Sequence, residues 1–438
     1  MPRPRVTTKV FALLCGLSFL LYLDRVNLST AASFVQKELS LSNLELGIAF
    51  SAFAYSYLVT QVIGGVIADK FGPRWTLMGC VAIWVVTTIA TGFVGSLASL
   101  FAVRMALGVG EGAALPASAR AIINWIPVGQ RGMVQGITHS FSRFGNAVAP
   151  PVVALLITLT NWRTSFVIVG ILTAVWLVFW SAIFRDHPRD HPDATAAELD
   201  RLPPRAEIAP GTTKRDPIPW RRLLKRVAPS AAVYFCYGWT GWLYFTWLPS
   251  FFLHAYSYNL KSSSIFASGV FLAGVAGDAL GGIVADRVFK RTGSLTLSRS
   301  VLISCTFVAS AICLIPVLAS DNLTVMTLAL SGAFFFIEMS IAPIWLVPMD
   351  VAPAYAGTAS GIINAGSALA GIISPILFGL IIDQTGSWTA PFVGSIVLLL
   401  IGAVLALAIR PEIRMSMGED PAAGGSAQAV LRHPASGL

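Results

Sequence analysis

The chain has 438 residues, of which 55% are hydrophobic and only 12% are charged, and its mean hydropathy is +0.73. A soluble protein carries about 25% charged residues, so this composition excludes an ordinary water-soluble fold. Lys and Arg outnumber Asp and Glu by 30 to 21, which gives a net charge of +9. The basic residues lie between long apolar runs and not on one basic face. This excludes a nucleic-acid-binding protein and indicates a polytopic membrane protein.

Twelve apolar runs are long enough to cross a bilayer as helices, which takes about 20 residues each. Their spacing does not suit the strands of a transmembrane barrel, so we predict an all-α membrane protein. The first run follows Arg3, Arg5 and Lys9 and is interpreted as an uncleaved span and not a signal peptide. The predicted spans are 9–32, 44–67, 76–96, 100–124, 132–158, 164–184, 227–253, 262–286, 298–319, 323–348, 354–382 and 388–409.

The loops between these runs differ in their content of Lys and Arg. One set of alternating loops holds only Lys37, Arg163 and Lys261, and the other set is strongly basic. By the positive-inside rule we expect the basic set, with both termini, to be cytoplasmic. The basic set comprises Lys70, Arg74, Arg131, Arg287, Lys290, Arg291 and Arg299.

One long polar segment, 185–226, divides the chain. It holds ten basic and seven acidic residues and several prolines, and we interpret it as a flexible cytoplasmic linker. The flanking segments, 1–184 and 227–414, are each expected to form a bundle of six helices. Residues 415–438 are rich in Gly, Ala and Ser and are predicted to be a disordered cytoplasmic tail.

Two sequence repeats relate the halves. GGVIADKFGPR at 64–74 recurs as GGIVADRVFKR at 281–291, and GITHSFSRFGNAVAPP at 136–151 is echoed by GIINAGSALAGIISPI at 361–376. Two parallel repeats of this length are typical of one large class of transporters, in which substrate binds near the bilayer midplane between the halves.

These motifs resemble the major facilitator superfamily. GGVIADKFGPR resembles its motif between the second and third helices, and RMALGVGEG at 104–112 resembles its fourth-helix motif. The resemblance covers the whole chain and implies twelve transmembrane helices in two pseudo-symmetric bundles that function as a monomer. Four further segments resemble the anion:cation symporter family, whose members carry sugar acids, hexuronates, phthalate-type acids and sulfonated carboxylates: LYLDRVNLS (21–29), AYSYL (54–58), YFCYGWTGWLYFTWLPSFF (234–252) and IAPIWLVPMDVAP (341–353).

Seven ionisable residues fall inside predicted spans, where a charge costs roughly 2.5–3.5 kcal/mol on insertion scales. Asp24 and Arg25 are neighbours, so on a helix they point about 100° apart and are expected to face different partners. Arg104 and Glu111 are seven residues apart, which places them on one helix face about 10 Å apart, too far for direct pairing. The full set is Asp24, Arg25, Arg104, Glu111, Arg143, Asp278 and Glu338.

The family resemblance implies roles for several of these residues. Arg25 matches the arginine that binds the substrate carboxylate, and Asp24 and Glu111 match acids assigned to proton coupling. Arg104 is expected to keep one acid ionised until substrate or a proton arrives. The alternative for these four residues is a purely structural buried ion network.

Three uncharged side chains are also predicted to contact substrate. Tyr22 and Tyr57 match family positions that donate hydrogen bonds to it, although either tyrosine could instead be an anchor at the membrane interface. Asn364 fits a contact from the second half. The alternative for Asn364 is a hydrogen bond between helices.

Arg143 departs from the family pattern. A third intramembrane cation near Arg25 and Arg104 would suit a substrate with two negative charges, and this inference fails if Arg143 faces a loop or pairs with Glu338. Glu338 is a candidate for proton coupling, whereas the roles of His139 and Asp278, in proton traffic, pairing or packing, stay open.

Four charged residues at the repeated loop motif are assigned to a cytoplasmic gate, where ion pairs between the halves would hold one conformation. These are Asp69, Arg74, Asp286 and Arg287.

No enzyme or metal motif is found. The five cysteines lie in apolar runs without a CxxC pair, and the sequence contains no HExxH and no Gly-rich phosphate loop. We therefore expect no cofactor, no metal and no nucleic-acid partner. A channel or a receptor-like sensor with a carrier fold is the weaker alternative.

We predict a secondary transporter that imports a small organic anion, such as a sugar diacid or a sulfonated carboxylate like sulfoacetate, by proton symport. Moving one negative charge inward against the membrane potential costs about 2.3 kcal/mol per 100 mV, so uptake requires accompanying cations. The alternative is an exchanger of organic anions without protons. Arg outnumbers Lys by 23 to 7, which suggests a GC-rich bacterial gene and the bacterial inner membrane.

Overall fold

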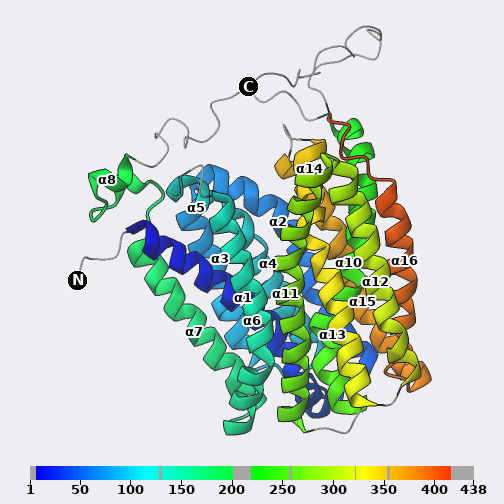
Figure 1. The fold of residues 1–438 in the computed structure, drawn as a ribbon. Coiled ribbons are helices and arrows are strands. Elements are labelled where there is room, and N and C mark those ends of the chain that lie inside the picture. The colour runs from blue at the N-terminus through cyan, green and yellow to red at the C-terminus, as the bar shows by residue number, and fades with distance from the viewer. Residues whose placement is uncertain are drawn as a thin grey trace.

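The computed structural model describes residues 6–127, 131–200, 219–255, 259–320, 322–352 and 356–415, and every regular element in these ranges is helical. The helices stand side by side in two groups, one from each part of the chain (Figure 1). The N-terminal group contains α1 (Val6–Leu39), α2 (Asn43–Phe71), α3 (Pro73–Thr91), α4 (Leu97–Gly112), α5 (Ala114–Trp125), α6 (Arg131–Leu159) and α7 (Trp162–Ile183).

The C-terminal group follows a short linker helix, α8 (Ala196–Leu199). Its helices α13 and α14 meet at Ser340 and together correspond to the predicted span 323–348. In the same way, α4 and α5 meet at Ala113 and together correspond to the predicted span 100–124. The group contains α10 (Trp220–Ala255), α11 (Leu260–Thr292), a short π-helical turn η3 (Leu297–Val301), α12 (Leu302–Ala319), α13 (Leu323–Met339), α14 (Ile341–Val351), α15 (Ala356–Thr385) and α16 (Phe392–Leu407).

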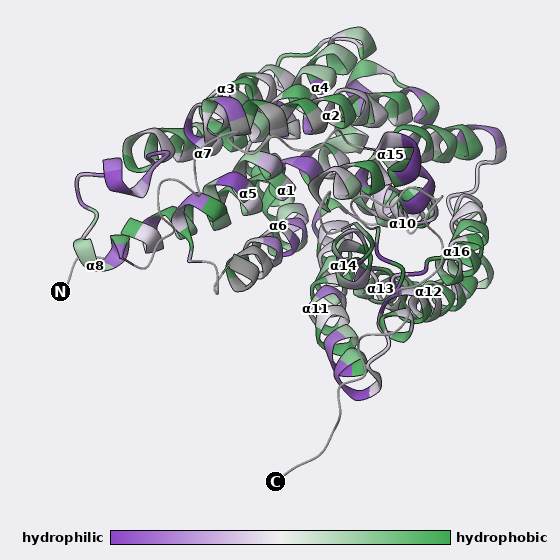
Figure 2. Ribbon diagram, turned by 90° about the horizontal axis from the view of Figure 1, so that it is seen from above, coloured by the Kyte–Doolittle hydropathy of each residue, from purple (hydrophilic) through white to green (hydrophobic). Residues whose placement is uncertain are grey.

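In the described part of the chain, nine helical segments are both long and apolar enough to cross a membrane. The remaining predicted spans correspond to α2, α10 and the shorter apolar helix α16. Apolar residues cover the outer helices (Figure 2), and large apolar side chains such as Val178, Leu328 and Val404 are more than 60% exposed on them. Such a surface is stable against lipid but not in water, so the predicted all-α membrane fold is confirmed.

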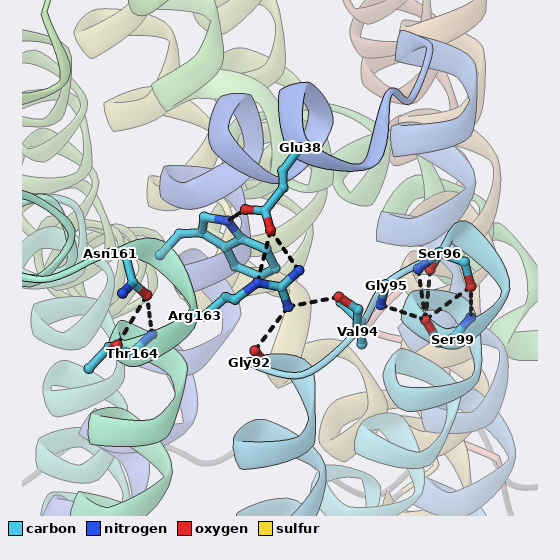
Figure 3. Close-up of polar contacts among 10 residues, drawn as sticks. Glu38, Gly92, Val94, Gly95, Ser96, Ser99, Asn161, Arg163 and Thr164 are labelled. Atoms are coloured by element: carbon cyan, nitrogen blue, oxygen red, sulfur yellow. Dashed lines mark hydrogen bonds and ion pairs between the residues drawn. The ribbon is translucent and has the colours of Figure 1, made fainter.

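Arg163 ties together three elements of the first group at the end remote from the linker (Figure 3). Its guanidinium donates hydrogen bonds to the Glu38 carboxylate at 2.8 and 3.0 Å and to the carbonyls of Gly92 and Val94 at 3.0 and 2.7 Å. Trp162 also donates to Glu38, at 2.5 Å. The ends of α1, α3 and α7 are thereby fixed to one another, which favours movement of this group as a unit.

The two groups contact each other mainly through α2 with α15 and through α6 with α11. Close approach of α2 and α15 depends on glycine: a Cβ at Gly47 would lie 2.3 Å from the carbonyl oxygen of Pro375, and one at Gly379 would lie 2.1 Å from that of Asn43. Neither position has room for a side chain. The groups are therefore closed against each other at the end where α2 begins.

A carboxylate from the second group caps the first turn of α2. Asp383 accepts hydrogen bonds from the backbone N–H of Asn43 at 3.1 Å and of Leu44 at 2.7 Å, and from the Asn43 side chain at 2.7 Å. Free N–H groups and the helix dipole make a helix N-terminus attractive to negative charge. Asp383 thus stabilises the closed arrangement at this end.

Part of the predicted linker, residues 185–200, is docked on the first group of helices. Asp186 accepts from the backbone N–H of Arg74 at 2.8 Å, and Glu198 accepts from the backbone and hydroxyl of Thr7 at 3.3 Å. Burial raises the pKa of Glu198, but hydrogen bonds from Thr195 and Thr7 outweigh it and hold the pKa below its ordinary value. Predictions for 201–218 and for the tail from 416 onward fall outside the described residues.

Asp383→Ala should open the closed end. Losing a helix cap costs about 0.5–2 kcal/mol, so we expect a cysteine placed at Ser51, one turn along α2 from Gly47, to react roughly tenfold faster with an impermeant maleimide. The experiment uses a background without the native cysteines.

Glu38→Ala is the matched control, because Glu38 pairs with Arg163 at the same end but only within the first group. Equal labelling rates in Asp383→Ala and in the parent would show that the cap does not hold the closed state.

Candidate substrate and ion-coupling site

The first buried ion pair joins α1 and α4. The Arg25 Nε donates to the Glu111 carboxylate at 3.0 Å, and the two side chains are 10% and 0% exposed. Three aromatic rings surround the guanidinium: its central carbon lies 4.8 Å from the centroids of Tyr22 and Tyr57 and 5.3 Å from that of Phe53. The aromatic faces stabilise the cation where water is excluded.

Asp24 points away from this pair, as its position next to Arg25 predicts. Its Oδ2 accepts hydrogen bonds from the Trp84 indole at 2.7 Å and from the Thr88 hydroxyl at 2.9 Å, both on α3. Asp24 is 1% exposed. The expectation that the two neighbouring charges face different partners is therefore confirmed.

Arg104 lies close to the same aromatic ring, Phe53, as Arg25. Its guanidinium carbon is 5.3 Å from the Phe53 centroid, as is that of Arg25, so the two carbons are at most twice this distance apart. Hydrogen bonding in this region is incomplete: Arg25 Nη2, Glu111 Oε1 and Arg104 Nε are buried without a hydrogen-bond partner among the described residues.

A chain of side-chain hydrogen bonds links the two groups of helices beside Arg25. Gln61 on α2 donates to the Tyr57 hydroxyl at 2.9 Å and accepts from the Asn364 amide on α15. This contact is the hydrogen bond between helices expected as the alternative for Asn364, and its contact with substrate stays a prediction. Tyr57 is 5% exposed and stacks on Phe53, with centroids 5.0 Å apart, which places it inside the protein and not at the membrane interface.

Arg143 on α6 forms the second cluster, and this cluster crosses between the groups. Its Nε lies 3.4 Å from Asp278 on α11, and its Nη2 lies 3.0 Å from Glu338 on α13. The inference of a free third cation for a dianionic substrate is therefore wrong, because Glu338 already pairs with Arg143. Tyr237 adds a hydrogen bond to Glu338 at 2.9 Å.

The two clusters are adjacent. Tyr22 lies under Arg25 and also 5.9 Å from the Arg143 guanidinium, and its ring meets Phe245 of the second group edge-on at 6.5 Å. His139 on the same helix as Arg143 lies within electrostatic range of Arg143 and Asp278. Tyr22 thus stands between the two arginines and not at a membrane interface.

The gating residues stay predictions. Asp286 and Arg287 are exposed on α11, and Arg74 donates to the carbonyl of Ser181 at 3.0 Å within its own group. The side chain of Asp69 lies outside the described part of the structure. The described residues contain no group of three or more His, Cys, Asp or Glu that could hold a metal ion.

The seven ionisable side chains within the predicted spans contain one more carboxylate than guanidinium, but the three fully buried carboxylates match the three arginines in number. With histidine counted as neutral, four carboxylates face three guanidiniums across the two clusters. Only Asp278, whose side chain is 19% exposed, has substantial access to solvent. The residues are Asp24, Glu111, Asp278 and Glu338 against Arg25, Arg104 and Arg143.

Two bundles of membrane-spanning helices with ionisable side chains buried at their meeting point define a membrane transporter. The Major Facilitator Superfamily model matches residues 14–375, and the chain belongs to this superfamily. The resemblance seen in its motifs is thereby confirmed.

Relatives and solved structures agree with this assignment. The chain is 40% identical over 422 residues to the "Probable sulfoacetate transporter SauU" of Cupriavidus necator, covering 96% of this chain and 98% of that protein. It is 31% identical over 375 residues to the "Hexuronate transporter" of Bacillus subtilis, covering 85% and 87%. A bacterial homologue of the human lysosomal transporter Spinster has a TM-score of 0.76 at 15% identity, over 93% and 98% of the two chains, which shows the shared fold. The chain is a transporter and not an enzyme, as predicted.

Sequence reasoning missed several residues at the site. Trp84 and Thr88 hold Asp24, Gln61 connects Tyr57 with Asn364, and Tyr237 holds Glu338. Gln61 is a polar residue inside a predicted span, which could have drawn attention to it. The others are ordinary residues of apolar helices, and only the packing of the helices reveals their partners.

Arg143→Gln should destabilise the protein more than Arg143→Gln/Glu338→Gln. Removing one partner of a buried ion pair costs about 3–5 kcal/mol because the other charge stays buried alone, and the second substitution removes that charge. Apparent melting temperatures of the purified protein in detergent measure the difference. Lys290→Gln, an exposed residue, serves as the control, and a double variant no more stable than Arg143→Gln would contradict the pairing.

Proposed function

We propose that the protein imports a small organic anion by symport with protons, using the cluster around Arg25 to bind the anion and the buried carboxylates to carry protons. The single observation that carries this proposal is the charge count. Three buried carboxylates already match the three guanidiniums in number, and the partly exposed Asp278 adds a fourth carboxylate, so no positive charge is left over before substrate binds. Adding an anion would leave a net negative charge at the clusters, and protons are the smallest cations that can offset it.

The anion site is assigned to Arg25 and Arg104. Both guanidiniums have buried N–H groups without a partner among the described residues, and both flank the ring of Phe53. A guanidinium presents a planar fork that fits a carboxylate or a sulfonate. Two such forks suit a doubly charged substrate, so support for a dianion comes from this pair and no longer from Arg143.

A sulfonated carboxylate such as sulfoacetate is the first substrate to test. Support comes from the 40% identity to the probable sulfoacetate transporter along nearly the full length of both chains. The 31% identical hexuronate transporter makes a sugar acid the second candidate.

Transport is proposed to proceed by rocking of the two groups of helices around these clusters. The structure is closed at the end where Asp383 caps α2, and the predicted topology places that end outside the cell. Arg143 pairs with acids of the opposite group, hence its ion pairs must be rearranged during rocking. Protonation of Glu338 would weaken one of them and link proton binding to movement.

Exchange of anions without protons remains the second candidate, because the same arginines would serve it. Collapse of uptake by a protonophore favours symport, and unaffected uptake favours exchange. Operation as a monomer in the bacterial inner membrane, with cytoplasmic termini, completes the proposal.

Arg25→Ala should weaken binding of labelled sulfoacetate by the purified protein. Hydrogen bonds to charged groups contribute about 1.5–3 kcal/mol each, so we expect the dissociation constant to rise at least about tenfold. Arg25→Ala/Glu111→Gln leaves no unpaired carboxylate and should bind equally weakly, which separates loss of binding from misfolding. An unchanged dissociation constant in both variants would remove Arg25 from the site.

Glu111→Gln should retain binding and counterflow of substrate but lose accumulation driven by a pH gradient, because an amide cannot take up the transported proton. Both activities are measured in proteoliposomes. Glu38→Gln, a carboxylate outside the clusters, should retain both. If Glu111→Gln still accumulates substrate with the pH gradient, Glu111 is not a proton carrier.

A further inference from the structure

A cavity of about 430 Å³ lies beneath the first group of helices, at the end that carries the linker. It is bounded by the turn between α2 and α3, by α5 and by the start of the linker. Its volume falls within the range of about 300–1,000 Å³ that is typical of ligand pockets. Four basic side chains line it: Lys70, Arg74, Arg120 and Arg185.

The acidic residues of this cavity do not cancel its positive charge. Asp186 lines the cavity, but its carboxylate is used to cap α3, where it accepts a hydrogen bond from the backbone N–H of Arg74 at 2.8 Å. The same carboxylate packs against Gly72: a Cβ at Gly72 would lie 2.6 Å from Asp186 Oδ1. The remaining acid, Asp190, is exposed at the edge. Four basic residues against two acids leave the cavity positive.

Hydrogen-bond donors are also left over. Arg74 uses Nη2 on the carbonyl of Ser181, but its Nε is buried without a partner among the described residues, as is the Nδ1 of His187. Both residues line the cavity. A bound anion would satisfy the Arg74 nitrogen directly and the His187 nitrogen when it carries a proton.

Aromatic side chains at the rim place the cavity at the depth of lipid headgroups. Phe71 and Trp75 are 59% and 60% exposed. The Lys70 ammonium lies 5.3 Å from the Phe71 ring, and the Arg74 guanidinium lies 5.4 Å from the Trp75 ring. Exposed tryptophan is typical of the membrane interface, and basic residues there attract anionic lipids.

We propose that this cavity binds a phosphate group, with the headgroup of an anionic phospholipid as its source and the acyl chains lying along Phe71 and Trp75. The linker is part of the site, since Trp125 and Asn124 donate to the carbonyls of Arg185 and Asp186 at 2.7 and 2.9 Å. A bound phosphate would therefore hold the linker against the first group of helices. This site is separate from the transport clusters.

The test measures binding of three probes to the purified full-length protein: dioctanoyl phosphatidylglycerol, dioctanoyl phosphatidylcholine and inorganic phosphate. Lys70→Gln/Arg185→Gln removes two basic residues of the cavity. Lys290→Gln/Arg291→Gln removes two exposed basic residues from α11 and is the matched control. Each basic residue near anionic lipid contributes about 1 kcal/mol to the binding free energy. Removing two should therefore weaken binding of phosphatidylglycerol roughly tenfold or more.

Binding of phosphatidylglycerol that is lost only in Lys70→Gln/Arg185→Gln, with weak binding of phosphatidylcholine, supports a lipid headgroup. Equally strong binding of inorganic phosphate, lost in the same variant, supports the site with a free anion as its source. Equal binding of phosphatidylglycerol by the wild type and Lys70→Gln/Arg185→Gln, or an equal loss in the control, would overturn the proposal. If the double variant does not fold, Lys70→Gln alone is measured, because Lys70 is exposed and its substitution should not disturb folding. A severalfold loss of phosphatidylglycerol binding in this variant supports the proposal, and unchanged binding overturns it.

Discussion

Charges buried in a low-dielectric interior have to be paired, and this constraint organises the centre of the protein. Arg25 is paired with Glu111, Arg143 is paired with Asp278 and Glu338, and aromatic rings cover both guanidiniums. The buried carboxylates Asp24, Glu111 and Glu338 equal the three guanidiniums in number, and the partly exposed Asp278 adds a fourth carboxylate. An interior with no spare positive charge, yet with guanidinium N–H groups that lack a partner among the described residues, is suited to accept an anion together with protons.

The two clusters differ in what they connect. The pair Arg25–Glu111 lies within the first group of helices and can persist while the groups rock, whereas Arg143 is bound to two helices of the opposite group. Tyr22 contacts both guanidiniums and the ring of Phe245. Changes at the proposed substrate site could therefore reach the contacts between the groups through one side chain. Asp383 supports the same conformation from the far end by capping α2.

Much of the fold could be predicted from the sequence because apolar length fixes a membrane helix, and each predicted span overlaps an observed helix or helix pair whose ends differ from the prediction by at most seven residues. The divergence of Asp24 and Arg25 followed from helix geometry alone. Pairing of Arg143 with Glu338 and a hydrogen bond between helices at Asn364 were open alternatives in the sequence, which could not decide them because they depend on which faces of α11, α13 and α2 meet these residues. The docking of Asp186 and Glu198 was missed because the linker's polar composition resembles that of a flexible segment, whereas its hydrogen bonds involve residues far away in sequence.

The central claim is that each anion enters with protons. It is tested most directly with a pH-sensitive dye inside sodium-free proteoliposomes without an initial pH gradient, to which sulfoacetate is added, or another anion whose uptake has been measured. Sulfoacetate is suitable because its sulfonate stays ionised and does not cross lipid as a neutral acid. The account predicts acidification of the interior that parallels uptake of the labelled anion and is absent from protein-free liposomes. Uptake of the anion without any change in internal pH would contradict it.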